Sequence, residues 1–290
     1  MGTGVTVDIP AANQKKVFDG VFARLKEIDR RFSTYKKDSE VSQYARGELK
    51  WWRMSRELRK IIKACQNAEK ETDGAFSAYY DMPVSHLDAA QENSNERTKR
   101  TTSTKSEQES VVDAVMRQEP RGAFGFAKRQ AKAMRRRHFD PSGYVKGWAI
   151  NEGSKIIEKN GFDTYCISIG GDIYASGDKI WRVGIQDPKN KMQSLLNLNI
   201  ENKSVATSGN YVRGAHIINP KTKKPANELL SLTVVGPSII DADVLATAAF
   251  VLGDFGIRYI NGQAKGYEAL ALHKNGHIEM TKGFSRYLDK

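Results

Sequence analysis

The segment from Pro237 to Gly253 constrains the fold most strongly, because it predicts a helix that has to be buried. Its sequence is P-S-I-I-D-A-D-V-L-A-T-A-A-F-V-L-G, with Ser238 placed to cap the N-terminus and Gly253 placed to end the helix. A helix of about four turns that is apolar almost all round belongs in a protein core rather than on a surface. The rest of the chain must therefore enclose this helix.

Asp243 is the exception within this apolar helix. An ionised carboxylate among Ile, Leu, Val, Ala and Phe side chains is too costly to bury without a cation, hydrogen-bond donors or a metal. Thr247 lies one turn later on the same face, so the two side chains offer two oxygen ligands for a hard cation such as Mg²⁺. The alternative is a structural role, with Asp243 as a cap or salt bridge and the Thr247 hydroxyl bonded to its own helix. This segment alone leaves both interpretations open.

Length and composition predict a globular chain and leave open one large domain or two closely joined lobes. A hydrophobic content of 39% suffices for a substantial core, and no apolar run reaches the length of a membrane span. The N-terminus, M-G-T-G-V, lacks the basic start and apolar run of a signal peptide. We expect a protein made without export, and hence intracellular, or a domain cut from a longer or exported precursor. Cys65 and Cys166 have no C-x-x-C spacing and are expected to be free thiols.

The net charge of +12 raises the question of nucleic-acid binding. Much of the excess is local, because eight Lys or Arg residues stand against one Glu between Arg117 and Arg137. No aromatic platform or zinc-ligand spacing accompanies this run, so we expect a solvated helix face rather than a nucleic-acid site. The polar stretch before it, about residues 88–110, predicts a mobile insertion, with helices expected at Val111–Met116 and Ala127–Arg137.

Periodicity and turn residues predict an α+β fold with a mixed sheet. Helices are expected at residues 13–30, from Ser39, at 54–72, from about 139 to 160 and at 237–253, and strands at 4–9, 165–177, from 181, at 232–235 and at 269–272. Gly170-Gly171 between apolar runs indicates a hairpin turn. Neither a G-x-G-x-x-G nor a G-x-x-x-x-G-K motif is present, so a Rossmann or P-loop nucleotide site is not supported.

Eight short blocks occur in an informative order along the chain. They are M-G-T, S-T-Y-K-K-D-S-E, G-A-F-S, D-P-S-G-Y-V-K-G, S-I-G-G-D-I-Y-A-S-G, A-T-S-G-N-Y, H-I-I-N-P-K-T and A-D-V-L-A-T-A. In sequence and spacing they resemble the ApbE family of FAD:protein FMN transferases, from Met1 to about Gly253. The resemblance is weak only from Asp81 to His138. It implies a single domain over residues 1–290 that has an α+β fold, with mixed, mostly antiparallel sheets flanked by helices. It also implies a cleft between lobes for FAD and metal.

The resemblance also implies an activity. Members of the family bind FAD and a divalent metal, usually Mg²⁺, and transfer FMN to a Thr hydroxyl of an acceptor flavoprotein with release of AMP. The acceptor Thr lies in an [ST]-G-A-[ST] site, which this chain lacks, so the acceptor is another protein or a reductase joined to this chain in a longer polypeptide. The alternatives are an FAD hydrolase or flavin-holding protein on the same fold and, more remotely, a basic nucleic-acid-binding module.

Site residues follow from the resemblance block by block. Asp243, Thr247 and the backbone carbonyl of Val145 match metal ligands, and Asp243 is therefore expected to be essential for catalysis. His216, which alone would more often be a structural residue, matches the candidate base for the acceptor hydroxyl. Other positions match those that hold FAD, namely Met1, Tyr35, Ala75, Phe76, Ser77, Ser142, Trp148 and Ile217. Ser77 departs from the family pattern, which has Asp there.

Overall fold

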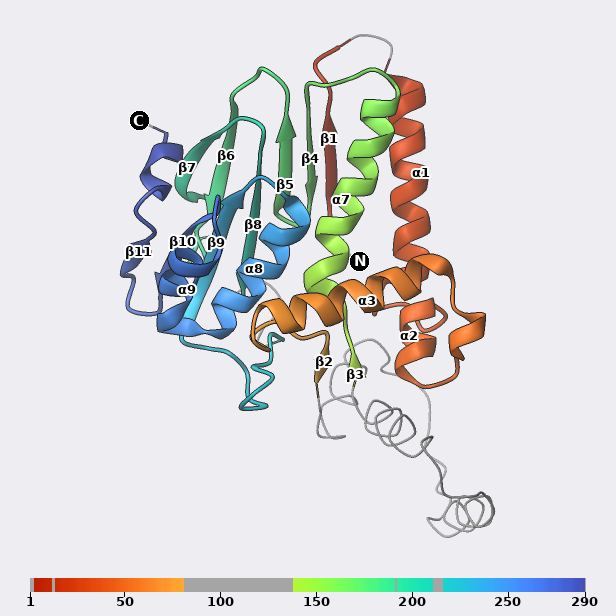
Figure 1. Cartoon of the computed structure of the whole chain (residues 1–290). Coiled ribbons are helices and arrows are strands. Elements are labelled where there is room, and N and C mark those ends of the chain that lie inside the picture. The colour runs from red at the N-terminus through yellow and green to blue at the C-terminus, as the bar shows by residue number, and fades with distance from the viewer. Residues whose placement is uncertain (1–2, 12–13, 81–137, 191, 211–215, 290) are drawn as a thin grey trace, which may run out of the picture. The chain divides into compact units, whose positions relative to one another are not determined.

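A seven-stranded antiparallel sheet is the central element of the computed structural model, which describes residues 3–11, 14–80, 138–190, 192–210 and 216–289 (Figure 1). Its strands, in spatial order, are β1 (Val5–Asp8), β4 (Tyr165–Ile169), β5 (Asp172–Ser176), β8 (Lys203–Gly209), β9 (Leu229–Gly236), β10 (Glu268–His273) and β11 (Ile278–Met280). All six neighbouring pairs run antiparallel, so the sheet agrees with the mostly antiparallel arrangement that we expected but is not mixed. The short strands β2 (Tyr79–Tyr80) and β3 (His138–Phe139) form a separate pair.

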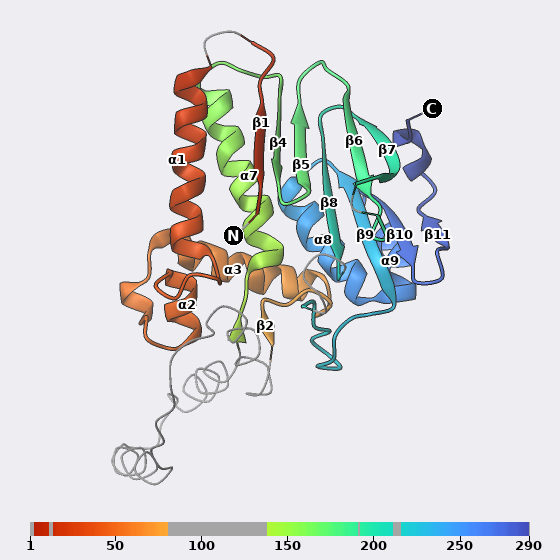
Figure 2. The same cartoon turned by 180° about the vertical axis from the view of Figure 1, so that it is seen from behind.

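Helices cover one face of this sheet (Figures 1 and 2). Helix α8 (Ile239–Val251) packs on β8 and β9, and α7 (Ser142–Lys159) packs on both α8 and β4. Helix α1 (Lys15–Phe32) lies along α7, and α3 (Arg56–Glu71) also contacts α7. The remaining helical elements are shorter: α2 (Glu40–Ala45), α9 (Gly256–Gln263), η1 (Trp51–Arg53), η2 (Gly253–Phe255) and η3 (Phe284–Tyr287). None of the helices in the described part of the chain has the length and apolarity that a membrane-spanning segment requires.

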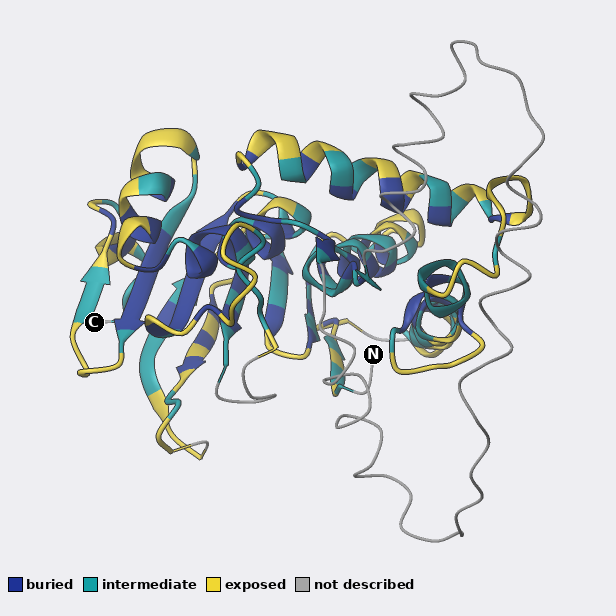
Figure 3. Cartoon of the chain, turned by 90° about the horizontal axis from the view of Figure 1, so that it is seen from below, coloured by how far each residue is buried: buried dark blue, intermediate teal, exposed yellow. Residues whose placement is uncertain are grey.

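A two-stranded hairpin, β6 (Trp181–Gln186) and β7 (Ser194–Ile200), covers the opposite face. Because side chains alternate along a strand, adjacent residues of the sheet enter different cores. Val205 of β8 packs with the hairpin, whereas its neighbour Ala206 packs with the helices. The sheet is therefore buried on both faces, as the dark blue strands of Figure 3 show.

The buried helix that the sequence predicts is α8. The Ser238 hydroxyl accepts a hydrogen bond from the Asp241 amide at 3.3 Å, which confirms the expected N-cap. Gly253, which follows the helix, has a φ of 58°, a left-handed conformation that favours glycine. Asp243 is 1% exposed, so the carboxylate is indeed inside the core.

Two glycines of α7 allow this helix to approach α8 closely. A Cβ atom at Gly147 would lie 2.6 Å from the carbonyl oxygen of Ile239, and one at Gly143 would lie 2.8 Å from Oγ1 of Thr247. Both distances are far shorter than a carbon–oxygen contact permits, so larger residues would push the helices apart. This close packing brings the N-terminal turns of α7 against the polar face of α8.

Several elements differ from the sequence predictions. Helices α1 and α3 lie within two residues of the expected bounds, and α7 begins three residues later than expected. Strands β7, β8 and β11 and helix α9 were not predicted. The polar insertion at about 88–110 and the helices expected at Val111–Met116 and Ala127–Arg137 lie outside the described residues. The unit formed by residues 1–80 and 139–290 carries every feature described below.

Candidate functional site

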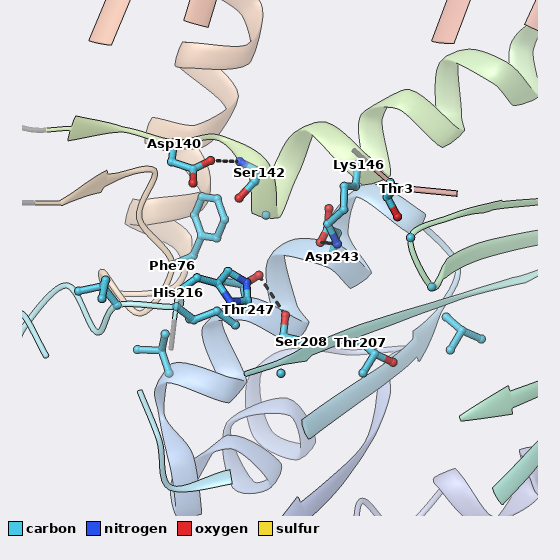
Figure 4. A pocket seen from close by; sticks show the side chains of 18 of the residues that line it. Thr3, Phe76, Asp140, Ser142, Lys146, Thr207, Ser208, His216, Asp243 and Thr247 are labelled. Carbon is cyan, nitrogen blue, oxygen red and sulfur yellow. Dashed lines mark hydrogen bonds and ion pairs between the residues drawn. The ribbon is translucent and has the colours of Figure 1, made fainter. Parts of the chain in front are cut away.

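A cavity of about 500 Å³ lies where α7, α8 and the main sheet meet (Figure 4). Its walls come from the first turns of α7, the middle of α8, the Gly170-Gly171 turn between β4 and β5, the end of β8 and strand β6. Several residues predicted for the site line it together: Ala75, Phe76, Ser77, Ser142, His216, Ile217, Asp243 and Thr247. Segments far apart in the sequence therefore converge on one cavity.

Lys146 forms the centre of a buried charge cluster beside this cavity. Its Nζ atom lies 3.1 Å from Oδ1 of Asp243 and also bonds to Oδ2 of Asp172. Each carboxylate accepts a further backbone hydrogen bond at 3.1 Å, Asp172 from the Thr207 amide and Asp243 from the Gly147 amide. Both carboxylates are 1% exposed, so the two share one ammonium group almost out of contact with water.

The electrostatics of this cluster are not fully balanced. Burial, with a smaller contribution from the nearby Asp172, raises the pKa of Asp243 to about 6 against the opposing effects of Lys146 and the Gly147 amide. Burial tends to lower the pKa of Lys146, but Asp172 and Asp243 outweigh it and hold that pKa above its ordinary value. The ammonium group therefore stays charged at neutral pH, while the ionised form of Asp243 is only partly compensated.

Thr247 presents its hydroxyl to the cavity one turn after Asp243. Its Oγ1 atom lies 3.2 Å from Oγ of Ser208 on β8, a hydrogen bond drawn as a dashed line in Figure 4. Asp243 forms a salt bridge with Lys146, as the structural interpretation of this helix expects. The salt bridge does not exclude a metal-binding role, because Asp243 and Thr247 both line the cavity.

The loop from Ala75 to Ser77 is held by local hydrogen bonds. The Phe76 amide donates to Oγ1 of Thr72 at 3.0 Å, and the Ser77 hydroxyl donates to Oε1 of Glu69 at 3.0 Å. Phe76 itself is 2% exposed yet reaches the cavity wall. Ser77, which replaces the Asp of the family pattern, consequently contributes a hydroxyl that is already bonded to an acid.

Three predicted residues lie elsewhere, and one is not described. Tyr35 and Val145 border a small adjoining depression, which they share with Ser142 and Lys146. Trp148 packs edge-on against Phe32 with ring centroids 5.5 Å apart, and it does not line the main cavity. Met1 lies outside the described residues. The roles of these four residues stay predictions, as do the roles of the predicted residues that line the cavity.

The structure brings several residues to the site that were not predicted from the sequence to belong there. Asp172 follows the Gly170-Gly171 turn at the start of β5, but nothing local indicates that it is buried and bonded to Lys146. Ser208 and the cavity-lining run Val183–Gln186 were likewise given no role. The signal for Asp172 was its position, since a polar residue straight after a turn at a strand end is well placed for a binding site.

Comparison with known proteins decides the family. The model of the ApbE family matches residues 1–271. The chain belongs to the ApbE family. Its sequence is 28% identical over 266 residues to the FAD:protein FMN transferase of Haemophilus influenzae, covering 84% of this chain and 74% of that relative. It is 26% identical over 275 residues to the FAD:protein FMN transferase of Escherichia coli K12, with 87% and 76% covered.

Solved structures agree with this ApbE fold. The flavin transferase ApbE from Vibrio cholerae matches with a TM-score of 0.70 at 23% identity, over 99% of this chain and 96% of that chain. The ApbE protein from Thermotoga maritima matches with a TM-score of 0.72 at 23% identity, over 100% and 97%. The curated relatives are transferases, and this ApbE-family chain is an enzyme of that class.

Proposed function

We propose that this ApbE-family enzyme is a Mg²⁺-dependent FAD:protein FMN transferase, which moves FMN from FAD to a Thr hydroxyl of an acceptor flavoprotein and releases AMP. The observation that carries the proposal is the convergence on one cavity of His216, from one block, with Asp243 and Thr247, from another. Its volume of about 500 Å³ falls in the usual range for small-molecule sites. The relatives named FAD:protein FMN transferase support the choice of substrate.

The donor groups suit a hard divalent cation. Asp243 and Asp172 carry two negative charges against the single positive charge of Lys146, which leaves the cluster one negative charge in excess. The hydroxyls of Thr247 and Ser208 add oxygen donors within the same cavity. In the described part of the chain no cluster of three or more His, Cys, Asp and Glu side chains could hold a metal, so Asp243 and Thr247 need the Val145 carbonyl and FAD oxygens as partners. A bound Mg²⁺ would neutralise the FAD diphosphate.

The chemistry requires one bond to form and one to break. The acceptor Thr oxygen bonds to the phosphorus of the FMN half, and the bond from that phosphorus to the bridging oxygen breaks, so that AMP leaves with the bridging oxygen. His216 accepts the proton of the attacking hydroxyl, because imidazole is the side-chain base best suited to proton transfer near neutral pH. Lys146 supplies fixed positive charge beside the cavity for the phosphates.

Mass spectrometry tests the proposal directly. An acceptor protein with a Thr in an [ST]-G-A-[ST] site is incubated with this enzyme, FAD and Mg²⁺, and a mass gain of one FMN is expected. The gain should vanish when EDTA removes the metal, and an acceptor with that Thr changed to Ala should gain nothing. FAD consumed to FMN and AMP without any mass gain would instead establish a hydrolase, and unchanged FAD would reject both activities.

A further inference from the structure

Strand β6 forms one wall of the cavity in an unusual way. Four consecutive residues, Val183 to Gln186, all line it. Successive side chains of a strand point to opposite faces, so side chains alone cannot bring four neighbours to the same cavity. The cavity must therefore meet this strand along its edge, where the main chain lies.

The burial of the side chains supports the same conclusion. Val183 and Ile185 are 6% and 3% exposed and belong to the core between the hairpin and the main sheet, with Val205 and Val235. Gly184, between them, has no side chain. From Val183 to Ile185, β6 therefore offers the cavity little apart from backbone N–H and C=O groups.

This edge has no strand partner among the residues that the structure describes, where β6 pairs with β7 alone. In an antiparallel pair every second residue directs its N–H and C=O away from the partner strand. Such groups at an exposed edge are a ready template for another extended segment. Here they line the cavity that also contains His216, Thr247 and Asp243.

We propose that the acceptor flavoprotein binds this enzyme by adding an extended segment as a strand along β6 from Val183 to Ile185, on the edge opposite β7, which places the acceptor Thr hydroxyl in the cavity. This inference rests on the proposed function and specifies how its protein substrate is recognised. Main-chain hydrogen bonds would supply the affinity, while side chains would point alternately into and away from the cavity. Small residues next to the Thr fit this arrangement, because the segment shares about 500 Å³ with FAD.

The test is a backbone N-methyl scan of a peptide substrate. A synthetic peptide of about ten residues with one Thr in a Ser-Gly-Ala-Thr site is made in versions that each carry one N-methylated amide, and KM for flavinylation is measured. Methylation removes one donor, so KM should rise by about tenfold at every second position and change little at the positions between. The intervening positions serve as matched controls for the added methyl group.

Amide hydrogen exchange gives an independent reading. With FAD and the Thr-to-Ala version of the peptide, which binds but cannot react, exchange should slow in β6, while no comparable slowing is expected in β11 at the far edge of the main sheet. The intact acceptor protein is assayed in parallel. If neither it nor the peptide gains FMN, the proposed function fails and the docking proposal with it. If the acceptor protein reacts but the peptide does not, or the N-methyl effect lacks a period of two, only the β6 proposal is overturned.

Discussion

Two arginines of α1, Arg24 and Arg31, together bind four carboxylates. By contrast, a single lysine of α7, Lys146, binds two carboxylates. Arg24 bonds to Glu27 at 2.9 Å and to Glu152 at 3.0 Å, which ties α1 to α7. Arg31 bonds to the same Glu27 at 2.8 Å and to residues of α2 and α3. Both clusters contain more carboxylates than cations, but they differ in how far water reaches the carboxylates.

The pKa values show the difference. Hydrogen bonds from Arg24 and Arg31 hold the pKa of Glu27 below its usual range, whereas burial raises the pKa of Asp243 to about 6. The side chain of Glu27 is 43% exposed and that of Asp243 is 2% exposed. The arginine cluster is thus a partly solvated clamp between helices in which Glu27 is stabilised as a carboxylate, whereas the lysine cluster holds a buried carboxylate whose ionised form is destabilised where it meets the cavity. A buried carboxylate with a raised pKa at a cavity is typical of a functional site.

Replacement of Asp243 by Asn should have the largest effect. We expect FMN transfer to fall by about 10³-fold, because an amide removes the charge that attracts the metal. The free energy of unfolding should not fall. The pKa of Asp243, about 6, lies above the ordinary Asp value of about 3.9, so ionisation at pH 7 opposes folding.

Transfer rates at saturating Mg²⁺ and urea unfolding at pH 7 would measure these two effects. Asp241→Asn is the matched control, since this exposed residue lies on the same helix and its carboxylate bonds to the Tyr267 hydroxyl at 3.0 Å. It should retain activity. Full activity of Asp243→Asn would remove Asp243 from the metal site and leave it as a structural partner of Lys146.

Asp172→Asn should have the second largest effect, a loss of roughly 10- to 100-fold in transfer. Asp172 is a positioning residue in our interpretation, because it orients the Lys146 ammonium group beside Asp243. We expect a higher KM for FAD together with a lower kcat, and Asp172→Glu should restore part of both. Asp178→Asn, at an exposed position two residues after the end of β5, is the control. An Asp172→Asn enzyme that loses only stability, with KM and kcat unchanged, would make Asp172 purely structural.

How far the sequence predicts each cluster depends on the range of the interactions. Asp243 and Thr247 could be found because both lie on one apolar helix, where a polar residue stands out and the i+4 spacing is fixed. The bond between Lys146 and Asp172 joins α7 to β5, and no local rule specifies which strand lies under that helix. Arg24 and Glu152 are separated by 128 positions and were likewise not predicted.

The same reasoning applies to the residues taken from the family resemblance. The blocks around Phe76, Ser142 and His216 do converge on the cavity. Trp148 directly follows a matching block, but on α7 its ring packs against Phe32. The alternation in W-R-V-G-I-Q predicts that β6 is a strand. It does not predict which segment pairs with each edge of that strand, which only the three-dimensional structure shows. Sequence patterns thus identify elements and some site residues, whereas the pairing of elements decides what reaches the cavity.

Arg24→Met should show the reverse of Asp243→Asn. The Arg24 side chain is 16% exposed and binds three carboxylates, so its loss leaves them without their shared cation. We expect the free energy of unfolding to fall by about 2 kcal/mol, reduced from a fully buried case because water still reaches the cluster. FMN transfer should be unchanged at temperatures where the variant is folded. Urea unfolding with Arg30→Met, an exposed arginine on the same helix, gives the comparison, and a loss of transfer without a loss of stability would contradict the clamp role.

Lys15→Gln should have no measurable effect on the free energy of unfolding, so it serves as the reference for an exposed charge pair. Lys15 and Asp19 form an i,i+4 pair at 2.7 Å on α1, but their side chains are 88% and 66% exposed. Water and salt screen such a pair, so its short distance says little about stability. Unfolding midpoints of Lys15→Gln and the unchanged protein should coincide in both low and high salt. A clear shift at low salt would show that distance, rather than burial, governs the charge pairs of this fold, and it would weaken the contrast between the arginine and lysine clusters.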